Sequence, residues 1–182
     1  MSVSLTLTDI RRTIKRNGGP ALKLARKRLL QYDDDSYSSQ ALRHLSKVTL
    51  HNALPVFPAL VSMANEAVCG DSEKAISFGE AILLISFAAD LHDDVIDKSL
   101  TKGSKLTVVG KFGESIAILS GDILLVEGLK QLTNAAEHLT TEQSKEIIQW
   151  VSDAVVEICK AEALQIRLKN TQELTPIEYE KV

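Results

Sequence analysis

Hydrophobic residues recur at intervals of three and four along most of the chain, and this spacing predicts a succession of α-helices. We expect a short leading helix that ends at Gly18-Gly19-Pro20, followed by helices over about residues 20–31, 37–50, 55–69, 72–97, 113–133 and 141–169. Thr140 with Gln143 forms a capping-box pattern, and Thr175-Pro176-Ile177-Glu178 forms a second one. Because this last helix has a start signal and no stop signal before Val182, we expect the chain to be truncated, and a naturally short chain with a frayed end is the alternative.

Composition supports an all-α fold. The chain is 45% hydrophobic and only 4% aromatic, and its four prolines leave room for long helices. With 182 residues it is long enough for one domain with a real core, which we assign to residues 1–182. Asp33-Asp34-Asp35-Ser36 is interpreted as a capped turn between helices.

Two further features bear on the compartment. No uninterrupted apolar run reaches the roughly 20 residues that cross a bilayer. Cys69 and Cys159 are isolated in the sequence, which indicates reduced thiols in a cytoplasmic protein.

The net charge of −3 gives no general basic field for nucleic acid, but the charge is uneven. Residues 1–30 hold eight Lys or Arg and one acid, so this segment carries +7 and the remainder −10. A solvated helix face is the favoured interpretation of such a run. A basic leader over about residues 1–18 that contacts an anionic membrane, or that acts as a transit peptide, is the alternative.

Four aspartates follow the longest apolar stretch. At 100° per residue, Asp90, Asp93, Asp94 and Asp97 project within a sector of about 100°. Like charges at this spacing repel, and the end of a helix disfavours anions, so the cluster implies a use. Mg²⁺ takes such oxygen ligands and often bridges them to phosphates. The following loop adds Lys98, Lys102 and Lys105, which could clamp a phosphate or a carboxylate substrate.

The context of this cluster resembles a known family. Leu-His-Asp-Asp-Val-Ile-Asp at 91–97, then Thr-Val-Val-Gly-Lys-Phe-Gly at 107–113 and Gly121-Asp122, resemble the trans-isoprenyl diphosphate synthase (polyprenyl synthetase) family. The likeness runs from about residue 55 to the end, with Glu-Ala-Leu-Gln at 162–165. It implies a helical bundle around a central cavity, usually dimeric, that joins an allylic diphosphate to isopentenyl diphosphate. Here the bundle would be incomplete at its C-terminal end.

The resemblance also assigns residues. Asp93, Asp94 and Asp97 match the first aspartate-rich motif, which holds Mg²⁺ on the allylic diphosphate, with Asp93 and Asp97 as the leading ligands. Lys102 lies where the family has a pair of diphosphate-binding arginines, and Gln165 matches a position that supports the site.

Product length is implied by the residues four and five before the motif. Bulky residues at these positions block the growing chain in the family, and here they are Ala89 and Ala88, with Ser86 a turn further. This implies an open tunnel and a product beyond about twenty carbons. Helix packing that requires small residues is the alternative interpretation, and Phe87 could still intrude.

The sequence also departs from the family. The basic segment that binds isopentenyl diphosphate is replaced by Ala53-Leu54-Pro55-Val56-Phe57, a histidine of the same pocket is replaced by Ser86, and no second aspartate-rich motif is present. We therefore do not expect the isolated chain to turn over. A non-catalytic or chain-length-setting subunit of a hetero-oligomeric synthase is the alternative, and a class I terpene cyclase is a more distant one.

Other polar residues receive structural interpretations. We expect His92 to be structural, Asp122 to be a buried and hydrogen-bonded carboxylate, and Glu162 to be a charge on a helix face rather than a support for the metal site. His44, His51 and His138 have no metal-ligand spacing and are interpreted as ordinary.

Overall fold

The computed structural model describes residues 6–48, 50, 53–169, 175, 176 and 180. These residues group into two compact units, 1–135 and 136–182, and each unit is considered by itself. Whether residues 1–182 act as one domain stays a prediction.

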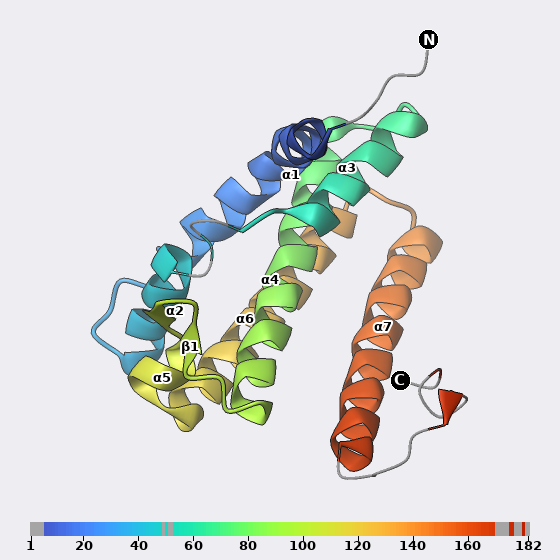
Figure 1. The fold of residues 1–182 in the computed structure, drawn as a ribbon. Helices are drawn as coiled ribbons and strands as arrows, with labels where there is room; N and C mark the ends of the chain where they lie inside the picture. Colours follow the sequence, from blue (N-terminus) through green and yellow to red (C-terminus); the bar gives the residue numbers. More distant parts are fainter. Residues whose placement is uncertain (1–5, 49, 51–52, 170–174, 177–179, 181–182) are drawn as a thin grey trace. The chain divides into compact units, whose positions relative to one another are not determined.

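The first unit is built almost entirely from helices, which confirms the all-α prediction (Figure 1). A two-stranded antiparallel hairpin interrupts them, with Thr101 opposite Leu106 and Lys102 opposite Lys105. In chain order the elements are α1 (Leu7–Leu29), α2 (Tyr37–Val48), α3 (Val56–Ala67), α4 (Ser72–Ile96), β1 (Thr101–Lys102), β2 (Lys105–Leu106), α5 (Val108–Phe112) and α6 (Glu114–Ala136).

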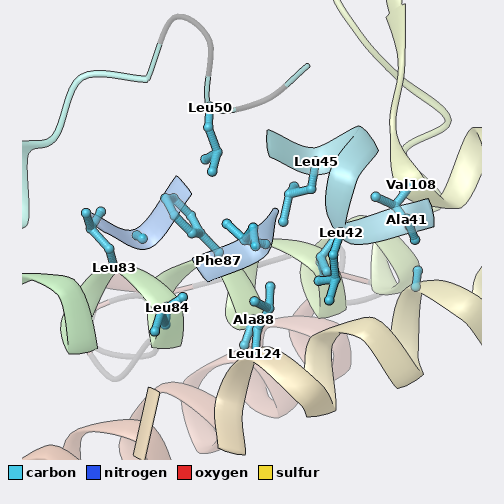
Figure 2. Close-up of a cluster of buried hydrophobic side chains, with 14 of the residues drawn as sticks. Ala41, Leu42, Leu45, Leu50, Leu83, Leu84, Phe87, Ala88, Val108 and Leu124 are labelled. Carbon is cyan, nitrogen blue, oxygen red and sulfur yellow. The ribbon is translucent and has the colours of Figure 1, made fainter. Parts of the chain in front are cut away.

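Helix α4 lies at the centre of this unit. Its residues Leu84, Ala88 and Leu91 recur at intervals of three and four and are almost fully buried. Figure 2 shows Leu84 and Ala88 of α4 near Leu124 of α6, and Leu42 of α2 belongs to the same buried cluster. Full burial of one leucine contributes about 1.5–3 kcal/mol, so this cluster fixes the position of α4.

The predicted break at Gly18-Gly19-Pro20 is wrong, because α1 runs without interruption from Leu7 to Leu29. Pro20 lacks the N–H that would bond one turn back, which costs a helix about 3 kcal/mol. Burial of Ala21, Ala25 and Leu29 against neighbouring helices offsets that cost. Gly18 is buried where α1 meets α3, since a Cβ at this position would strike the carbonyl oxygen of Pro55.

The segment after α4 also differs from the expectation of a loop followed by a helix at 113. Gly103 adopts φ of +64° in the two-residue turn between β1 and β2. Thr107 then caps the short helix α5 by accepting a hydrogen bond from the Gly110 amide at 3.0 Å. Gly113, at φ of +86°, ends α5, and α6 begins at Glu114.

The second unit is dominated by α7 (Thr141–Leu168). Thr140 and Gln143 form the predicted capping box, with the two reciprocal hydrogen bonds at 3.1 and 3.3 Å. The second predicted box, at Thr175-Pro176-Ile177-Glu178, falls largely outside the described residues.

Helix α4 is long and apolar enough to cross a membrane by length and composition alone, although Glu80 and Asp90 interrupt its apolar run. Half of its most apolar window is buried inside the structure. A core helix of a globular unit passes the same test, and its packing against α1, α3 and α6 accounts for this composition.

Candidate functional site

Helix α4 carries the aspartate cluster at its C-terminal end. Asp71 caps the other end, where its side chain accepts a hydrogen bond from the Glu73 amide at 2.9 Å. The last turn contains no basic residue, so no cation within that turn offsets the negative charge. Asp97 is the C-cap, and its amide donates to the Asp93 carbonyl at 2.8 Å.

The four aspartates form two pairs, Asp90 with Asp94 and Asp93 with Asp97, and the two members of each pair are one helical turn apart. Lys102 Nζ lies 2.6 Å from Asp90 Oδ1 and 3.1 Å from Asp94 Oδ1, so this lysine bridges the first pair. Asp93 and Asp97 form the second pair, and both are exposed. Lys102 of the loop therefore contacts the aspartate cluster. It pairs with Asp90 and Asp94, whereas the leading metal ligands expected from the sequence are Asp93 and Asp97.

Burial makes Asp94 the most constrained of the four. Its side chain is 5% exposed, against 36% for Asp90. Burial raises the pKa of Asp94 above its usual value, and the charges of Asp90 and Asp93 raise it further, while Lys102 acts in the opposite direction. Burial lowers the pKa of Lys102, but the two carboxylates outweigh that effect and leave the pKa raised. The ammonium group is therefore held in its charged form.

The hairpin that carries Lys102 is fixed at several points. The Thr107 hydroxyl donates to the Ser99 carbonyl at 2.6 Å, and the Thr107 amide donates to the Leu100 carbonyl at 3.0 Å. His44 of α2 hydrogen-bonds the Leu106 carbonyl at 2.9 Å, so this histidine has a positioning role that spacing along the chain could not indicate. The base of the hairpin that carries Lys102 is thus held by α2, through His44, and by the segment that follows α4, through Ser99 and Leu100.

A metal ion would find a restricted set of ligands. Among the described residues, no group of three or more His, Cys, Asp or Glu side chains is arranged to hold one. Asp93 and Asp97 fit a Mg²⁺ ion that takes one or two carboxylate oxygens and completes its shell with water and phosphate. The arrangement does not fit a cage made of protein ligands alone. Asp94, paired with Lys102, is the least available of the three predicted ligands.

The two alanines implicated in product length lie in different environments. Ala88 is 2% exposed and packs in the core near Leu124 (Figure 2). Ala89 is exposed. Phe87 is buried in the same core cluster. The Ser86 hydroxyl donates to the Ile82 carbonyl at 2.8 Å within α4. Ala89 is therefore the position of the two that a ligand could reach without disturbing the core.

Gln165 and Glu162 belong to α7 and therefore to the second unit. Gln165 is exposed, and Glu162 is partly exposed. Their assignment relative to the aspartates stays a prediction.

The predictions made for Asp122 and His92 had different outcomes. Asp122 is 59% exposed, so the prediction of a buried carboxylate is wrong. It lies 3.4 Å from His92 Nε2, which also contacts the Ile118 carbonyl at 3.3 Å. His92 packs against Gly121, where a Cβ would strike its ring. This arrangement ties α4 to α6 and agrees with a structural role for His92.

The segment that lacks basic residues begins α3. Pro55 is its N-cap and is buried, while Val56 and Phe57 are exposed. Arg43, on α2, is committed to the Tyr32 and Asp34 carbonyls. The segment 53–57 contains no lysine or arginine. Arg43 does not replace the missing cation, because its guanidinium is bonded to these two carbonyls.

The chain is similar to known proteins over most of its length. A family model described as polyprenyl synthetase matches residues 41–182. The chain is 27% identical over 157 residues to the short chain isoprenyl diphosphate synthase of Methanothermobacter thermautotrophicus. This alignment covers 86% of this chain and 47% of that protein. The chain is 30% identical over 135 residues to the heptaprenyl diphosphate synthase component 2 of Bacillus subtilis, which covers 74% of this chain and 36% of that protein.

A solved structure supports the same relationship. The heptaprenyl diphosphate synthase from Staphylococcus aureus aligns with a TM-score of 0.70 and 31% identity, over 91% of this chain and 50% of that one. The chain thus spans about half the length of the relatives it matches, or less.

Proposed function

Because the chain belongs to the polyprenyl synthetase family, we propose that it carries the allylic diphosphate side of a Mg²⁺-dependent prenyltransferase. The observation that supports this most directly is the end of α4, where two exposed carboxylates, Asp93 and Asp97, lie next to a pair that already holds the ammonium group of Lys102. A site with both cationic and anionic groups suits a Mg²⁺ diphosphate, because the metal binds the carboxylates and the lysine binds the remaining oxygens.

Each residue then has a distinct task. Asp93 and Asp97 would hold Mg²⁺, which when bound neutralises a diphosphate and stabilises its charge as a leaving group. Lys102 would donate a hydrogen bond to a diphosphate oxygen, with one ammonium in place of the planar fork of an arginine. The second substrate would be isopentenyl diphosphate, as for the family.

The length of the product is a finer part of the proposal. The methyl group of Ala89 is exposed one turn before Asp93, which leaves room for an isoprenoid chain alongside α4. We therefore propose a long product. Ala88 would contribute only through packing, since it is part of the core.

Binding can be tested without turnover. Isothermal titration of the chain with Mg²⁺ and a non-hydrolysable allylic diphosphate analogue should give heat that Asp93→Ala abolishes. Glu157→Ala, which removes an exposed carboxylate of α7, is the matched control and should bind like the parent chain. Equal binding by Asp93→Ala and the parent would overturn the assignment of this site.

A second candidate function is a subunit that does not turn over alone. It is supported by the missing basic segment at 53–57 and by the likeness to a protein named as component 2 of a heptaprenyl diphosphate synthase. Such a subunit would shape the cavity or set the product length in a hetero-oligomer, whereas a homodimer is the expectation from the family alone. Prenyl product made at a normal rate by this polypeptide without a partner would count against the hetero-oligomer.

We further propose that α1 brings the protein to an anionic membrane surface on the cytoplasmic side. Six cationic residues fall within a sector of about 120° of the helix, on the side away from the buried residues Ala21, Ala25 and Leu29. A prenyl product is itself a lipid, so a membrane is a suitable destination for it. The basic sector comprises Arg12, Lys15, Arg16, Lys23, Arg26 and Lys27.

A further inference from the structure

Lys102 makes its shortest contact with a residue outside the Asp-Asp-x-x-Asp motif. Its Nζ lies 2.6 Å from Asp90 Oδ1, compared with 3.1 Å from Asp94 Oδ1. Asp90 precedes the motif by three residues and receives no role from it. Asp90 and Asp94 are one turn apart on α4, so their carboxylates project from the same face and can share one cation.

The two parts of the protein that meet at Lys102, the end of α4 and the hairpin, are each held in place by other interactions. Asp94 is almost fully buried on α4, and the hairpin backbone is fixed through Thr107 and His44. The Lys102 side chain, by contrast, is a flexible four-carbon stem with many rotamers. A second carboxylate beside the ammonium narrows the orientations that it can adopt.

The hydrogen-bonding capacity of the ammonium group is only partly used. It has three N–H donors, of which two are accounted for by Asp90 and Asp94. The Lys102 side chain is 40% exposed, so an anion in solvent can reach the third donor. A donor that is already oriented costs little rearrangement when an anion arrives.

We propose that Asp90 is a positioning residue, which together with Asp94 holds Lys102 beside the Asp93–Asp97 pair with one N–H directed to a diphosphate. This inference rests on the proposed function, because the diphosphate is the ligand that Lys102 would serve. Asp90 itself does not touch the ligand.

The effect of Asp90 on binding has two components of opposite sign. Removal of its negative charge favours any anion nearby, whereas loss of its hydrogen bond frees the lysine to adopt other orientations. A single substitution therefore does not separate them. A double-mutant cycle does, because the contribution of Lys102 is measured once with Asp90 and once without it.

The binding experiment uses isothermal titration of inorganic diphosphate with Mg²⁺ into the chain and into Lys102→Met, Asp90→Asn and the double variant. With Asp90 present, we expect Lys102→Met to weaken binding about tenfold, the size of one charge-assisted hydrogen bond. In the Asp90→Asn background we expect less than about threefold. An equal loss in both backgrounds would mean that Asp90 acts only through its charge, and a larger loss without Asp90 would mean that it sequesters the lysine. Either result overturns the proposal.

A second measurement tests the contact without any ligand. Acylation of individual lysines by an amine-reactive ester, followed by peptide mass analysis, reports how strongly each ammonium is held. We expect Asp90→Asn to accelerate modification of Lys102 by about threefold or more and to leave Lys160 unchanged. Glu157→Gln is the matched control, because Glu157 pairs with Lys160 at 2.7 Å and its loss should affect Lys160 alone.

The two measurements together distinguish failure of the proposed function from failure of the role of Asp90. If the parent chain binds no diphosphate but Lys102 responds to Asp90→Asn, the proposed function fails and the contact between Asp90 and Lys102 stands. If the parent chain binds diphosphate and Lys102 reactivity does not change in Asp90→Asn, the role of Asp90 is overturned and the proposed function stands.

Discussion

Arg28 Nε donates a hydrogen bond to Glu80 Oε1 at 2.7 Å and so joins α1 to α4 in the interior of the first unit. The Glu80 side chain is only 4% exposed. The same guanidinium donates to Gln131 Oε1 at 2.8 Å and lies 3.7 Å from Glu127 Oε2, so that α6 is included. The hydrogen bond that Arg28 donates to Glu80, together with the charges of Glu80 and Glu127, raises the pKa of Arg28. One cation therefore links three of the helices that contribute to the core, α1, α4 and α6.

Glu80→Ala is expected to lower the free energy of unfolding by about 3 kcal/mol, because it leaves the Arg28 guanidinium without its buried partner. Urea denaturation followed by circular dichroism measures the change. Glu66→Ala removes an exposed glutamate of α3 and should shift stability by less than about 0.5 kcal/mol. Replacement of both partners, as Arg28→Met with Glu80→Leu, should recover much of the loss. A Glu80→Ala variant as stable as Glu66→Ala would show that the linkage contributes little.

Gly18 and Gly19 provide a matched pair within α1. A Cβ on Gly18 would strike the Pro55 carbonyl oxygen, which is backbone and cannot move aside cheaply, whereas a Cβ on Gly19 would meet nothing within 4 Å. We expect Gly18→Ala to destabilise the unit by about 1–3 kcal/mol through overpacking. Gly19→Ala should stabilise it by up to about 1 kcal/mol, the difference in helix propensity. Thermal unfolding of the two variants checks this, and similar melting temperatures would contradict the close packing of α1 on α3.

This pair of glycines also shows why the sequence predicted α1 incorrectly. Gly-Gly-Pro is a strong local signal for a helix boundary, and local signals were all that the sequence offered. The outcome depends on Pro55, which lies 37 positions further along the chain and comes close enough to need a glycine. The helices without such a conflict, including α4 and the capped start of α7, were predicted to within a few residues.

The aspartate site was predictable in part for a similar reason. The spacing of Asp90, Asp93, Asp94 and Asp97 along one helix fixes that they cluster, and the lysines in the following loop indicate a nearby cation. Which carboxylates receive Lys102 depends on the turn at Gly103 and on the burial of Asp94, which arise from packing. The missed role of His44 has the same origin, since its partner Leu106 lies 62 residues away.

Ala88 and Ala89 should respond in opposite ways to the same enlargement. Ala88→Phe places a ring in the core near Leu124 and is expected to cost about 1–3 kcal/mol or more. Ala89→Phe adds the ring on an exposed surface and should change stability by less than about 0.5 kcal/mol. Chemical denaturation distinguishes the two. Only Ala89→Phe is then a fair test of product length, because a shorter product from a destabilised Ala88→Phe protein would have a second explanation. Equal stability of the two variants would place Ala88 outside the core.

The basic sector of α1 predicts binding to anionic lipid. Sedimentation with vesicles of phosphatidylcholine containing phosphatidylserine should recover the protein, and vesicles of phosphatidylcholine alone should not. Each cation near such a surface contributes about 1 kcal/mol, so Arg12→Gln, Arg16→Gln and Lys23→Gln together should weaken binding by about two orders of magnitude. The control neutralises three exposed lysines elsewhere, Lys105, Lys130 and Lys145, with the same change in net charge. If both triple variants lose binding equally, general electrostatic attraction is responsible and α1 has no special role. If neither does, the sector is an ordinary solvated helix face.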